Sequence, residues 1–427
     1  MKWYTFRIKQ QQQNKRDVLF FMICFLFACI RGMEYWIAYF TGDHDGKITT
    51  PLLLSALYVV YASLILAGVI NIINREKTWR IITQIPKRFP FLTNLMMGIV
   101  SCISLICLLE FCFYLLYSHA IPHSPQRENA GTYTEGYFQK DELLGYKPKA
   151  SAEISSILIE DKKTLYNVIY SIDMYHRRMT PAIQRESRTK FALFFGCSYT
   201  FGEGVENNET FPYYFSEFAL EYMPYNYGFH GYGPQEMLAK LQYNSLTKEI
   251  KEIQGIGIYL YLPDTHEQRA IGNMSVFNGW GKNMPFYTFD FHRNLMRKGS
   301  FSSGRPVISY LYSLLGQSYV IKYFGIQFPS KLTEKHYRLT AKIIEEAKNE
   351  FNKKFMSDHF YVIIYPNTTR KNIIPYLQKA GIIYFDYSDL FDSSLEQYNI
   401  IGDGHPSSEA YKILAKKLSE DIANLNQ

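Results

Sequence analysis

The sequence predicts an α/β domain with a mostly parallel sheet, preceded by a transmembrane region of three helices. Three long apolar runs fill the first 120 residues, and from residue 191 onward short β-rich apolar runs alternate with helical patterns. A polar stretch rich in turn-forming residues, 121–140, separates the two parts. The 427-residue chain is 47% hydrophobic and 17% aromatic, which argues against a disordered chain. Its net charge of +7 is mild, and no block of Lys and Arg is large enough to propose a nucleic-acid surface.

The apolar runs cover residues 18–40, 51–73 and 91–117. Each is long enough to cross a bilayer core of about 30 Å as a helix. Buried helices of a soluble protein are the less favoured alternative, because all three runs are long and consecutive. The first run is too long for a cleaved signal peptide and contains Arg31 and Glu34, so an uncleaved anchor is expected.

The basic residues predict the orientation of these spans. They cluster before the first run and between the second and third, whereas the loop 41–50 holds two Asp and one Lys. Basic segments stay in the cytoplasm. We therefore expect a multi-pass protein of the bacterial inner membrane with a cytoplasmic N-terminus. Everything after about residue 118 would then be periplasmic or otherwise extracytoplasmic.

Charged residues inside the spans need partners, because a charge in a membrane helix is costly. Arg31 and Glu110 lie at similar depths in the first and third runs, and Glu34 is one turn from Arg31. We expect either an Arg31–Glu110 or an Arg31–Glu34 pair. The alternative is that Arg31 extends its side chain to the membrane surface.

We divide the chain into a transmembrane anchor (1–120), a linker with a small β-rich lead-in (121–188) and the α/β domain (189–427). The lead-in contains an expected hairpin at 152–173. Expected strands of the domain lie at 191–195, 256–262, 359–366 and 382–388, and a further short strand ends at residue 229. Expected helices lie at 209–223, 234–250, 332–355, 371–381 and 407–425. An insert at about 267–330, rich in Gly and aromatic residues, is either a partly helical cap over the site or a peripheral packing element.

The motif FGCSYTFGEGV, residues 195–205, follows the first strand and places Ser198 between glycines. A strand-to-helix turn there would raise the hydroxyl above the sheet. A serine hydroxyl is a weak nucleophile, so it needs a base and an orienting carboxylate. The loop GDGHPS before the last helix supplies Asp403 and His405, and it belongs to the same carboxyl edge of a parallel sheet. The alternatives are a plain turn at Ser198 and a helix N-cap at Asp403.

Three blocks taken together resemble the SGNH (GDSL-type) hydrolase superfamily: Gly196–Thr200, Asn226–Gly233 and Asp403–Pro406. The resemblance covers about residues 190–425. It implies a three-layer, flavodoxin-like sheet domain with Ser198 as nucleophile, His405 as general base and acid, and Asp403 orienting His405. It also implies an oxyanion hole built from the N–H groups of Ser198 and Gly231. Gly228, Gly231 and Gly233 as turn formers alone are the alternative.

Two departures from the superfamily pattern stand in this sequence. The acid usually stands three residues before the histidine, where this chain has Gly402. We keep Asp403, because some envelope acetyltransferase branches use the shorter Asp-x-His spacing. The third block lacks its usual asparagine, so Asp264 or His266 is the candidate to complete the oxyanion hole. The remaining substitutes for Asp403 are Asp386, Asp389 and Asp392.

The predicted function is that of a membrane-anchored serine esterase acting through an acyl-serine intermediate. Its substrate would be an acylated envelope carbohydrate, a lipid or a small ester. An O-acyltransferase that modifies an envelope polysaccharide is the first alternative, and a non-catalytic binding or assembly module with an envelope partner is the second. We expect no cofactor and no metal, because five of the six cysteines lie in apolar segments and the histidines lack ligand spacing.

Overall fold

The computed structural model describes residues 90–120, 127–134, 136–243, 246–366 and 372–425. The chain forms two compact units, Met1–Leu105 and Ile106–Gln427. Helix α4 (Pro90–Ala120) begins in the first unit and ends in the second. Its segment Ser101–Ser118, with a mean hydropathy of 1.8, is the one stretch within the described ranges that is long and apolar enough to cross a membrane. The helix expected at 91–117 is therefore present, whereas the expected spans at 18–40 and 51–73, with Arg31 and Glu34, lie outside the described residues.

The second unit is an α/β domain built on a five-stranded parallel sheet, as the alternation of strands and helices predicts. The strand order is β12-β11-β8-β6-β7. Their bounds are β6 (Lys190–Phe195), β7 (Tyr222–Asn226), β8 (Gln254–Tyr261), β11 (Phe360–Ile364) and β12 (Ile383–Asp386). In chain order this is 2-1-3-4-5, in which the direction of winding reverses between β6 and β8. Sheets of this kind bind ligands at that reversal, outside the carboxyl ends of the strands.

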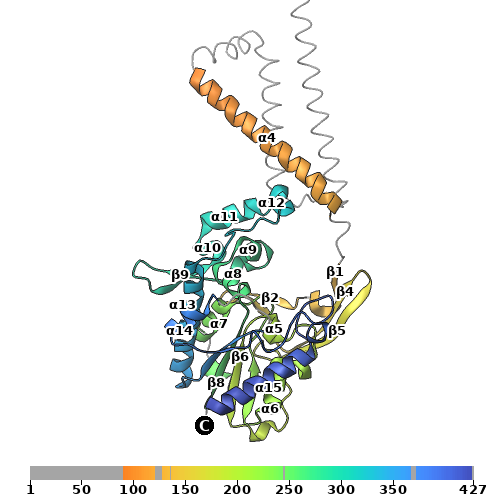
Figure 1. The fold of residues 1–427 in the computed structure, drawn as a ribbon, viewed down its shortest axis with the longest axis vertical. Helices are drawn as coiled ribbons and strands as arrows, with labels where there is room; N and C mark the ends of the chain where they lie inside the picture. The colour runs from red at the N-terminus through yellow and green to blue at the C-terminus, as the bar shows by residue number, and fades with distance from the viewer. Residues whose placement is uncertain (1–89, 121–126, 135, 244–245, 367–371, 426–427) are drawn as a thin grey trace, which may run out of the picture. The chain divides into compact units, whose positions relative to one another are not determined.

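Helices cover both faces of the sheet (Figure 1). On one face α6 (Phe211–Phe218) packs on α15 (Ser408–Leu425), and on the other α7 (Pro234–Tyr243) packs on α13 (Glu334–Phe355). The short helix α14 (Ile374–Lys379) packs against α13 on the same face. Because both faces are covered, the central strands read as continuous apolar runs such as Phe191–Phe195, every residue of which is buried.

Two expected helices are shorter than the sequence pattern indicates. The helix expected at 209–223 ends at Phe218, because Tyr222–Asn226 pairs with β6 as β7 and is buried throughout. Strand pairing with a buried neighbour overrides the local helical pattern there. The helix expected at 234–250 ends at Tyr243, and a 3₁₀ turn, η5 (Leu246–Lys248), follows it.

The lead-in is mostly β structure, as expected. Its elements are β1 (Arg127–Ala130), η2 (Gly131–Thr134), β2 (Phe138–Asp141), β3 (Gly145–Pro148), β4 (Ala152–Glu160), β5 (Lys163–Ile172) and η3 (Arg185–Ser187). The hairpin β4–β5 turns at Asp161 and Lys162, which both have positive φ. Isolated bridges from Arg178 to Ile172 and to Asn226 then join this hairpin to β7.

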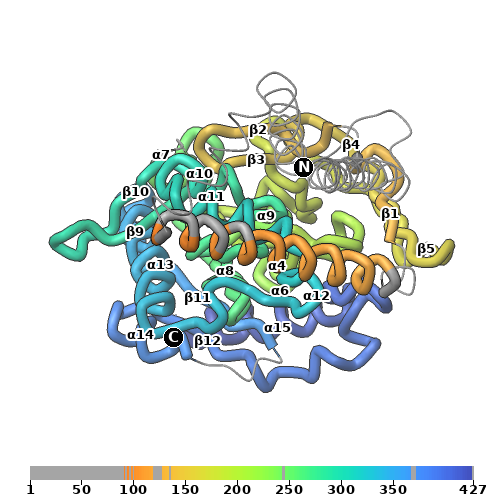
Figure 2. The backbone as a smooth tube through the Cα atoms, turned by 90° about the horizontal axis from the view of Figure 1, so that it is seen from above, coloured from red at the N-terminus to blue at the C-terminus, as the bar shows by residue number. Residues whose placement is uncertain are grey.

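The insert is a mixture of helices and one hairpin. It contains α8 (Thr265–Ile271), α9 (Met274–Gly279), η6 (Gly281–Asn283), β9 (Pro285–Phe289), β10 (Leu295–Ser300), α10 (Phe301–Gly304), α11 (Pro306–Leu315) and α12 (Tyr319–Tyr323). The β9–β10 hairpin projects from the domain, as both views show (Figures 1 and 2). The helices α10–α12 lie over α8 and α9, away from the strands (Figure 1).

Arg178 links the lead-in to the segment that follows Ser198. Its side chain is only 1% exposed and donates to the carbonyl oxygens of Phe201, Gly202 and Val205. The guanidinium also lies 4.5 Å from the ring centre of Tyr170. A single buried cation therefore satisfies three backbone carbonyls of one loop, which fixes that loop against the lead-in.

We expect Arg178→Met to destabilise the domain by about 3 kcal/mol or more, because it leaves buried carbonyl groups without their charged donor. The measurement is denaturant or thermal unfolding of the full chain, followed by circular dichroism. The exposed Arg185, replaced as Arg185→Met, is the matched control and should change stability by less than about 0.5 kcal/mol. Equal unfolding midpoints for the two variants would contradict the structural role of Arg178.

Candidate active site

Ser198 stands at the first position of a short helix that follows the interior strand β6. The strand ends at Phe195, Gly196 and Cys197 make the turn, and α5 (Ser198–Phe201) begins. Gly196 has φ +150°, and a Cβ there would lie 2.1 Å from Thr200 Oγ1. The turn therefore needs glycine, because a side chain would collide with the helix that it starts. Ser198 is 6% exposed at the carboxyl end of the sheet.

The loop before α15 brings His405 to Ser198. His405 Nε2 lies 2.9 Å from Ser198 Oγ, and His405 Nδ1 lies 2.5 Å from Asp403 Oδ2. Residues 198, 403 and 405, which sequence patterns single out, thus form one continuous hydrogen-bonded line. The hydroxyl of Tyr199 also donates to the carbonyl of Gly404 at 3.0 Å, which ties the two loops together.

Asp403 does not cap the last helix. Helix α15 begins at Ser408, and the Oγ of Ser407 accepts a hydrogen bond from the N–H of Ala410 at 3.4 Å. Of the substitute carboxylates, Asp386 accepts from Ser388 and Asp392 from Ser394. The carboxylate in contact with His405 Nδ1 is that of Asp403.

The neighbouring carboxylates raise the pKa of His405, although burial of the ring acts in the opposite direction. Burial lowers the pKa of His405, but the hydrogen bond to Asp403 and the charges of Glu203 and Asp403 outweigh it and raise the pKa above its ordinary value. Arg127 lies beside Asp403: its Nη1 is 3.9 Å from Oδ1, and its Nε donates to Glu160 at 2.8 Å. With Nδ1 donating to Asp403, the Nε2 atom is the acceptor that faces Ser198.

Glu203 is a second carboxylate at His405 that sequence reasoning missed. Its Oε2 lies 3.3 Å from His405 Nε2 and 2.7 Å from His230 Nδ1, and His230 Nε2 lies 3.1 Å from the Tyr137 hydroxyl. Burial raises the pKa of Glu203, but the charge and hydrogen bond of His230, with the charges of His405 and Arg178, lower it to about 2. Glu203 is therefore a carboxylate anion at every pH at which His405 titrates.

A local signal for Glu203 was present in the sequence. It stands between Gly202 and Gly204, both of which have positive φ, in a motif that otherwise holds apolar and small residues. Its backbone N–H donates to the carbonyl of Ser198 at 3.1 Å. The turn folds back on the start of α5, so the backbone of Glu203 lies next to Ser198.

The second sequence block lies against α5. Asn226 Nδ2 donates to the carbonyl of Thr200 at 3.0 Å, and a Cβ on Gly228 would lie 2.6 Å from the N atom of Phe201. Gly231 has φ +73°, and its carbonyl accepts from Trp280 Nε1 at 3.3 Å. Gly228 and Gly231 are thus required by close packing and by backbone conformation, and the role of Gly231 as an oxyanion donor stays a prediction.

The structure places the third block in the aromatic core. His266 is fully buried, and its Nδ1 lies 2.7 Å from the Tyr259 hydroxyl and accepts from the N–H of Leu262 at 3.3 Å. Burial lowers the pKa of His266 well below its ordinary value, so the ring is neutral and carries its proton on Nε2. Asp264 precedes α8 with φ +60°. These contacts are with Tyr259 and the α8 turn, so a part for Asp264 or His266 in the oxyanion hole stays a prediction.

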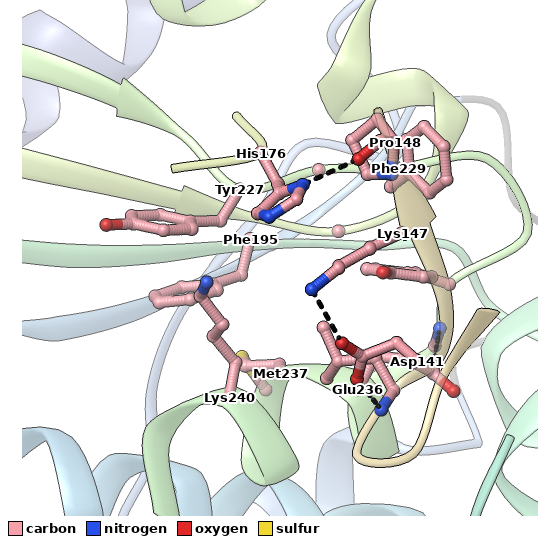
Figure 3. A pocket seen from close by; sticks show the side chains of 15 residues that line it. Asp141, Lys147, Pro148, His176, Phe195, Tyr227, Phe229, Glu236, Met237 and Lys240 are labelled. Carbon is pink, nitrogen blue, oxygen red and sulfur yellow. Dashed lines mark hydrogen bonds and ion pairs between the residues drawn. The ribbon is translucent and has the colours of Figure 1, made fainter. Parts of the chain in front are cut away.

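Two hollows lie beside this constellation. A cavity of about 60 Å³ behind Gly196 is lined partly by Tyr227, Lys147 and Glu236, and Figure 3 shows Lys147 pointing towards Asp141, 3.0 Å away. Burial raises the pKa of Glu236 to about 8. Neither Ser198 nor His405 lines this cavity, so it is separate from the hydroxyl side of the turn.

The second hollow is an open depression of about 520 Å³, lined by Tyr199 of α5 and by residues of the loop that contains Asp403. Tyr199, Asn399 and the run Gly402–Gly404 are among its lining residues. It borders Asp403 and Tyr199, the residue after Ser198, while Ser198 and His405 themselves are not among its lining residues. Among the described residues, no three His, Cys, Asp or Glu side chains lie close enough to hold a metal ion.

Comparisons with known proteins give a weak structural likeness. No family model matches the chain, and no curated protein matches it. Among solved structures it is similar to a provisionally assigned lipolytic protein of the G-D-S-L family from Desulfitobacterium hafniense DCB-2. The two share 14% sequence identity over 54% of this chain and 98% of that chain, with a TM-score of 0.28.

Proposed function

We propose that the chain is a membrane-anchored serine esterase that works through an acyl-serine intermediate. The observation that carries the proposal is the line from Ser198 Oγ to His405 Nε2 and from His405 Nδ1 to Asp403. In the first half of the reaction Nε2 takes the Ser198 proton as Oγ attacks the ester carbonyl. The same proton then goes to the departing alkoxide, so that an alcohol leaves and the acyl group stays on Ser198.

The second half of the reaction returns the enzyme to its starting state. Water gives a proton to His405 Nε2 and attacks the acyl carbonyl, and the proton passes to Ser198 Oγ as the carboxylic acid leaves. A sugar hydroxyl in place of water would give O-acyl transfer by the same steps. The N–H groups of Ser198 and Gly231 are the proposed donors to the oxyanion.

The membrane anchorage is part of the same proposal. It rests on α4, whose apolar segment Ser101–Ser118 directly precedes the domain, and on the apolar runs and basic flanks of the N-terminal region. With a cytoplasmic N-terminus, the domain faces the cell envelope. An ester-bearing envelope carbohydrate or lipid, or a small ester, is the matching substrate class.

Glu203 adds an element to this mechanism. Its Oε2 can accept a hydrogen bond from His405 Nε2 only after that atom has taken the serine proton. The interaction therefore strengthens as the imidazolium forms, which is the condition for stabilising a transition state rather than the resting enzyme. Glu203 and Asp403 hold the protonated ring from opposite sides, one at each nitrogen.

Ser198→Ala should abolish labelling of the full chain by a fluorophosphonate probe, because the probe phosphonylates an activated serine hydroxyl. Labelled protein is measured by fluorescence after gel electrophoresis. Ser302→Ala, at a serine that donates to the carbonyl of Lys282, is the matched control and should keep its label. A folded wild-type chain that takes no label would favour a binding module instead.

Asp403→Asn should lower kcat/KM for a short p-nitrophenyl ester by roughly 10²- to 10⁴-fold, because the amide no longer holds His405 in the productive tautomer. Asp392→Asn is the control, since Asp392 accepts from Ser394. The assay is initial-rate hydrolysis at several substrate concentrations. Near-normal activity in Asp403→Asn would assign the orienting role to another carboxylate.

Glu203→Gln should move the acid limb of the kcat/KM profile to lower pH. The base must be neutral to act, so activity rises with pH through the pKa of His405. The Glu203 charge raises that pKa, and its removal lowers it. The exposed Glu153, replaced as Glu153→Gln, should leave the limb in place. An unchanged limb in Glu203→Gln, or one moved to higher pH, would refute the electrostatic role.

A further inference from the structure

Helix α11 is oriented against the rule for a helix on a soluble protein. Its polar side chains face the protein: Ser309 is 6% exposed and donates to the carbonyl of Phe301, and Arg305, just before the helix, donates to the carbonyls of Ile271 and Gly272. Its apolar side chains face outward. We define the docking face as the exposed residues Val307, Tyr310, Leu311, Leu314, Tyr323 and Phe324 of α11 and the α12 region.

The docking face is apolar over a continuous stretch of chain. No charged residue occurs from 306 to 321, and Val307 is 72% exposed. A surface helix of a soluble protein directs its polar face to water, and exposed apolar patches of this kind mark contact with a protein or a membrane. In Figure 1 these helices lie on the side of the insert that faces away from the sheet.

The contacts of α12 indicate whether the docking face meets a protein or a membrane. Both oxygens of Glu110, in α4, accept hydrogen bonds from its start: Oε1 from the Ser318 hydroxyl at 2.5 Å and Oε2 from the Tyr319 N–H at 2.7 Å. The ring of Tyr319 then lies 4.9 Å from that of Tyr114 and 6.0 Å from that of Tyr117. Glu110, Tyr114 and Tyr117 recur at the helical period, so α12 packs along one face of α4.

This contact fixes the depth of α12 relative to the apolar segment of α4. Glu110 lies eight residues before Ser118, the end of that segment, which corresponds to about 12 Å along the helix axis. The half-thickness of a bilayer core is about 15 Å. Helix α11, with ten residues, is about 15 Å long, which is too short to cross the core and suits a helix that lies within one leaflet.

We infer that the docking face lies in the outer leaflet of the bilayer that α4 crosses, with lipid acyl chains as its occupant. The inference rests on the proposed membrane anchorage and extends it from one helix to the insert. The rings of Tyr323 and Phe324 each lie 5.2 Å from that of Phe113, so these two members of the docking face also border α4. The carboxylate of Glu110 is satisfied by the start of α12 at membrane depth, so it needs no water there.

The same contacts connect the lipid surface to the candidate active site. Asn278 Nδ2, in α9, donates to the carbonyl of Tyr312 in α11 at 2.8 Å, and Trp280, the next residue but one, donates to the carbonyl of Gly231. Docking of α11 thus holds the second block, and with it Ser198, at a fixed distance from the membrane surface. A site in this position acts on esters presented at that surface.

The test uses the full chain in phospholipid nanodiscs made of phosphatidylethanolamine and phosphatidylglycerol. The photoreactive residue p-benzoylphenylalanine replaces Leu311, and mass spectrometry measures adducts with lipid. Phe291→p-benzoylphenylalanine is the matched control, since Phe291 is 96% exposed at the tip of the β9–β10 hairpin. We expect several-fold more lipid adduct at position 311 than at position 291. The second variant Leu311→Glu, with the photoreactive residue at position 314, should lose most of its lipid adduct.

Each outcome decides the matter. Equal lipid adducts at positions 311 and 291 would overturn the inference, and so would adducts at 311 with another part of this chain or with a second copy. Ser198→Ala should give the same lipid adducts as the wild-type chain, because the readout needs no catalysis. A chain that forms the adducts but hydrolyses no ester would leave the docking intact and refute the proposed activity.

Discussion

The position of β6 inside the sheet, between β7 and β8, is the constraint on which the site depends. The strand ends between β7 and β8, at the point where the winding of the sheet reverses. Gly196 then lets the backbone turn within contact distance of Thr200 and Leu260, where a side chain would not fit. Ser198 is presented at that edge because the strand is rigid and the turn is tight.

The loop around Ser198 is held by charge as well as by packing. Arg178 satisfies three carbonyls of the segment after Ser198, and Arg127 pairs with Glu160 and approaches Asp403. Both arginines come from the β-rich lead-in. The lead-in is therefore a structural part of the domain rather than a spacer, because its arginines contact both loops that meet at His405.

His405 sits between two carboxylates with different duties. Asp403 contacts Nδ1, whereas Glu203 approaches Nε2, the atom that exchanges the proton in the proposed mechanism. The charge and hydrogen bond of His230, with the charges of His405 and Arg178, lower the pKa of Glu203 to about 2 against the effect of burial, so a carboxylate anion stands beside His405. In the proposed mechanism, Asp403 orients the resting ring towards Ser198, and Glu203 stabilises the ring once Nε2 is protonated.

The sequence by itself determined the features that depend on local pattern. Continuous apolar strands alternating with amphipathic helices indicate a covered parallel sheet, and glycines around Ser198 indicate a tight turn. The motif order also places Ser198, Asp403 and His405 at one sheet edge.

Tertiary structure decided the features that depend on contacts between residues far apart in the chain. The helix from residue 211 stops at Phe218 because β7 pairs with β6, Glu203 reaches His405 across 202 positions, and Glu110 meets α12 across 208. Local propensity carries no information about such distant partners, since burial and pairing set their energies only in the folded chain.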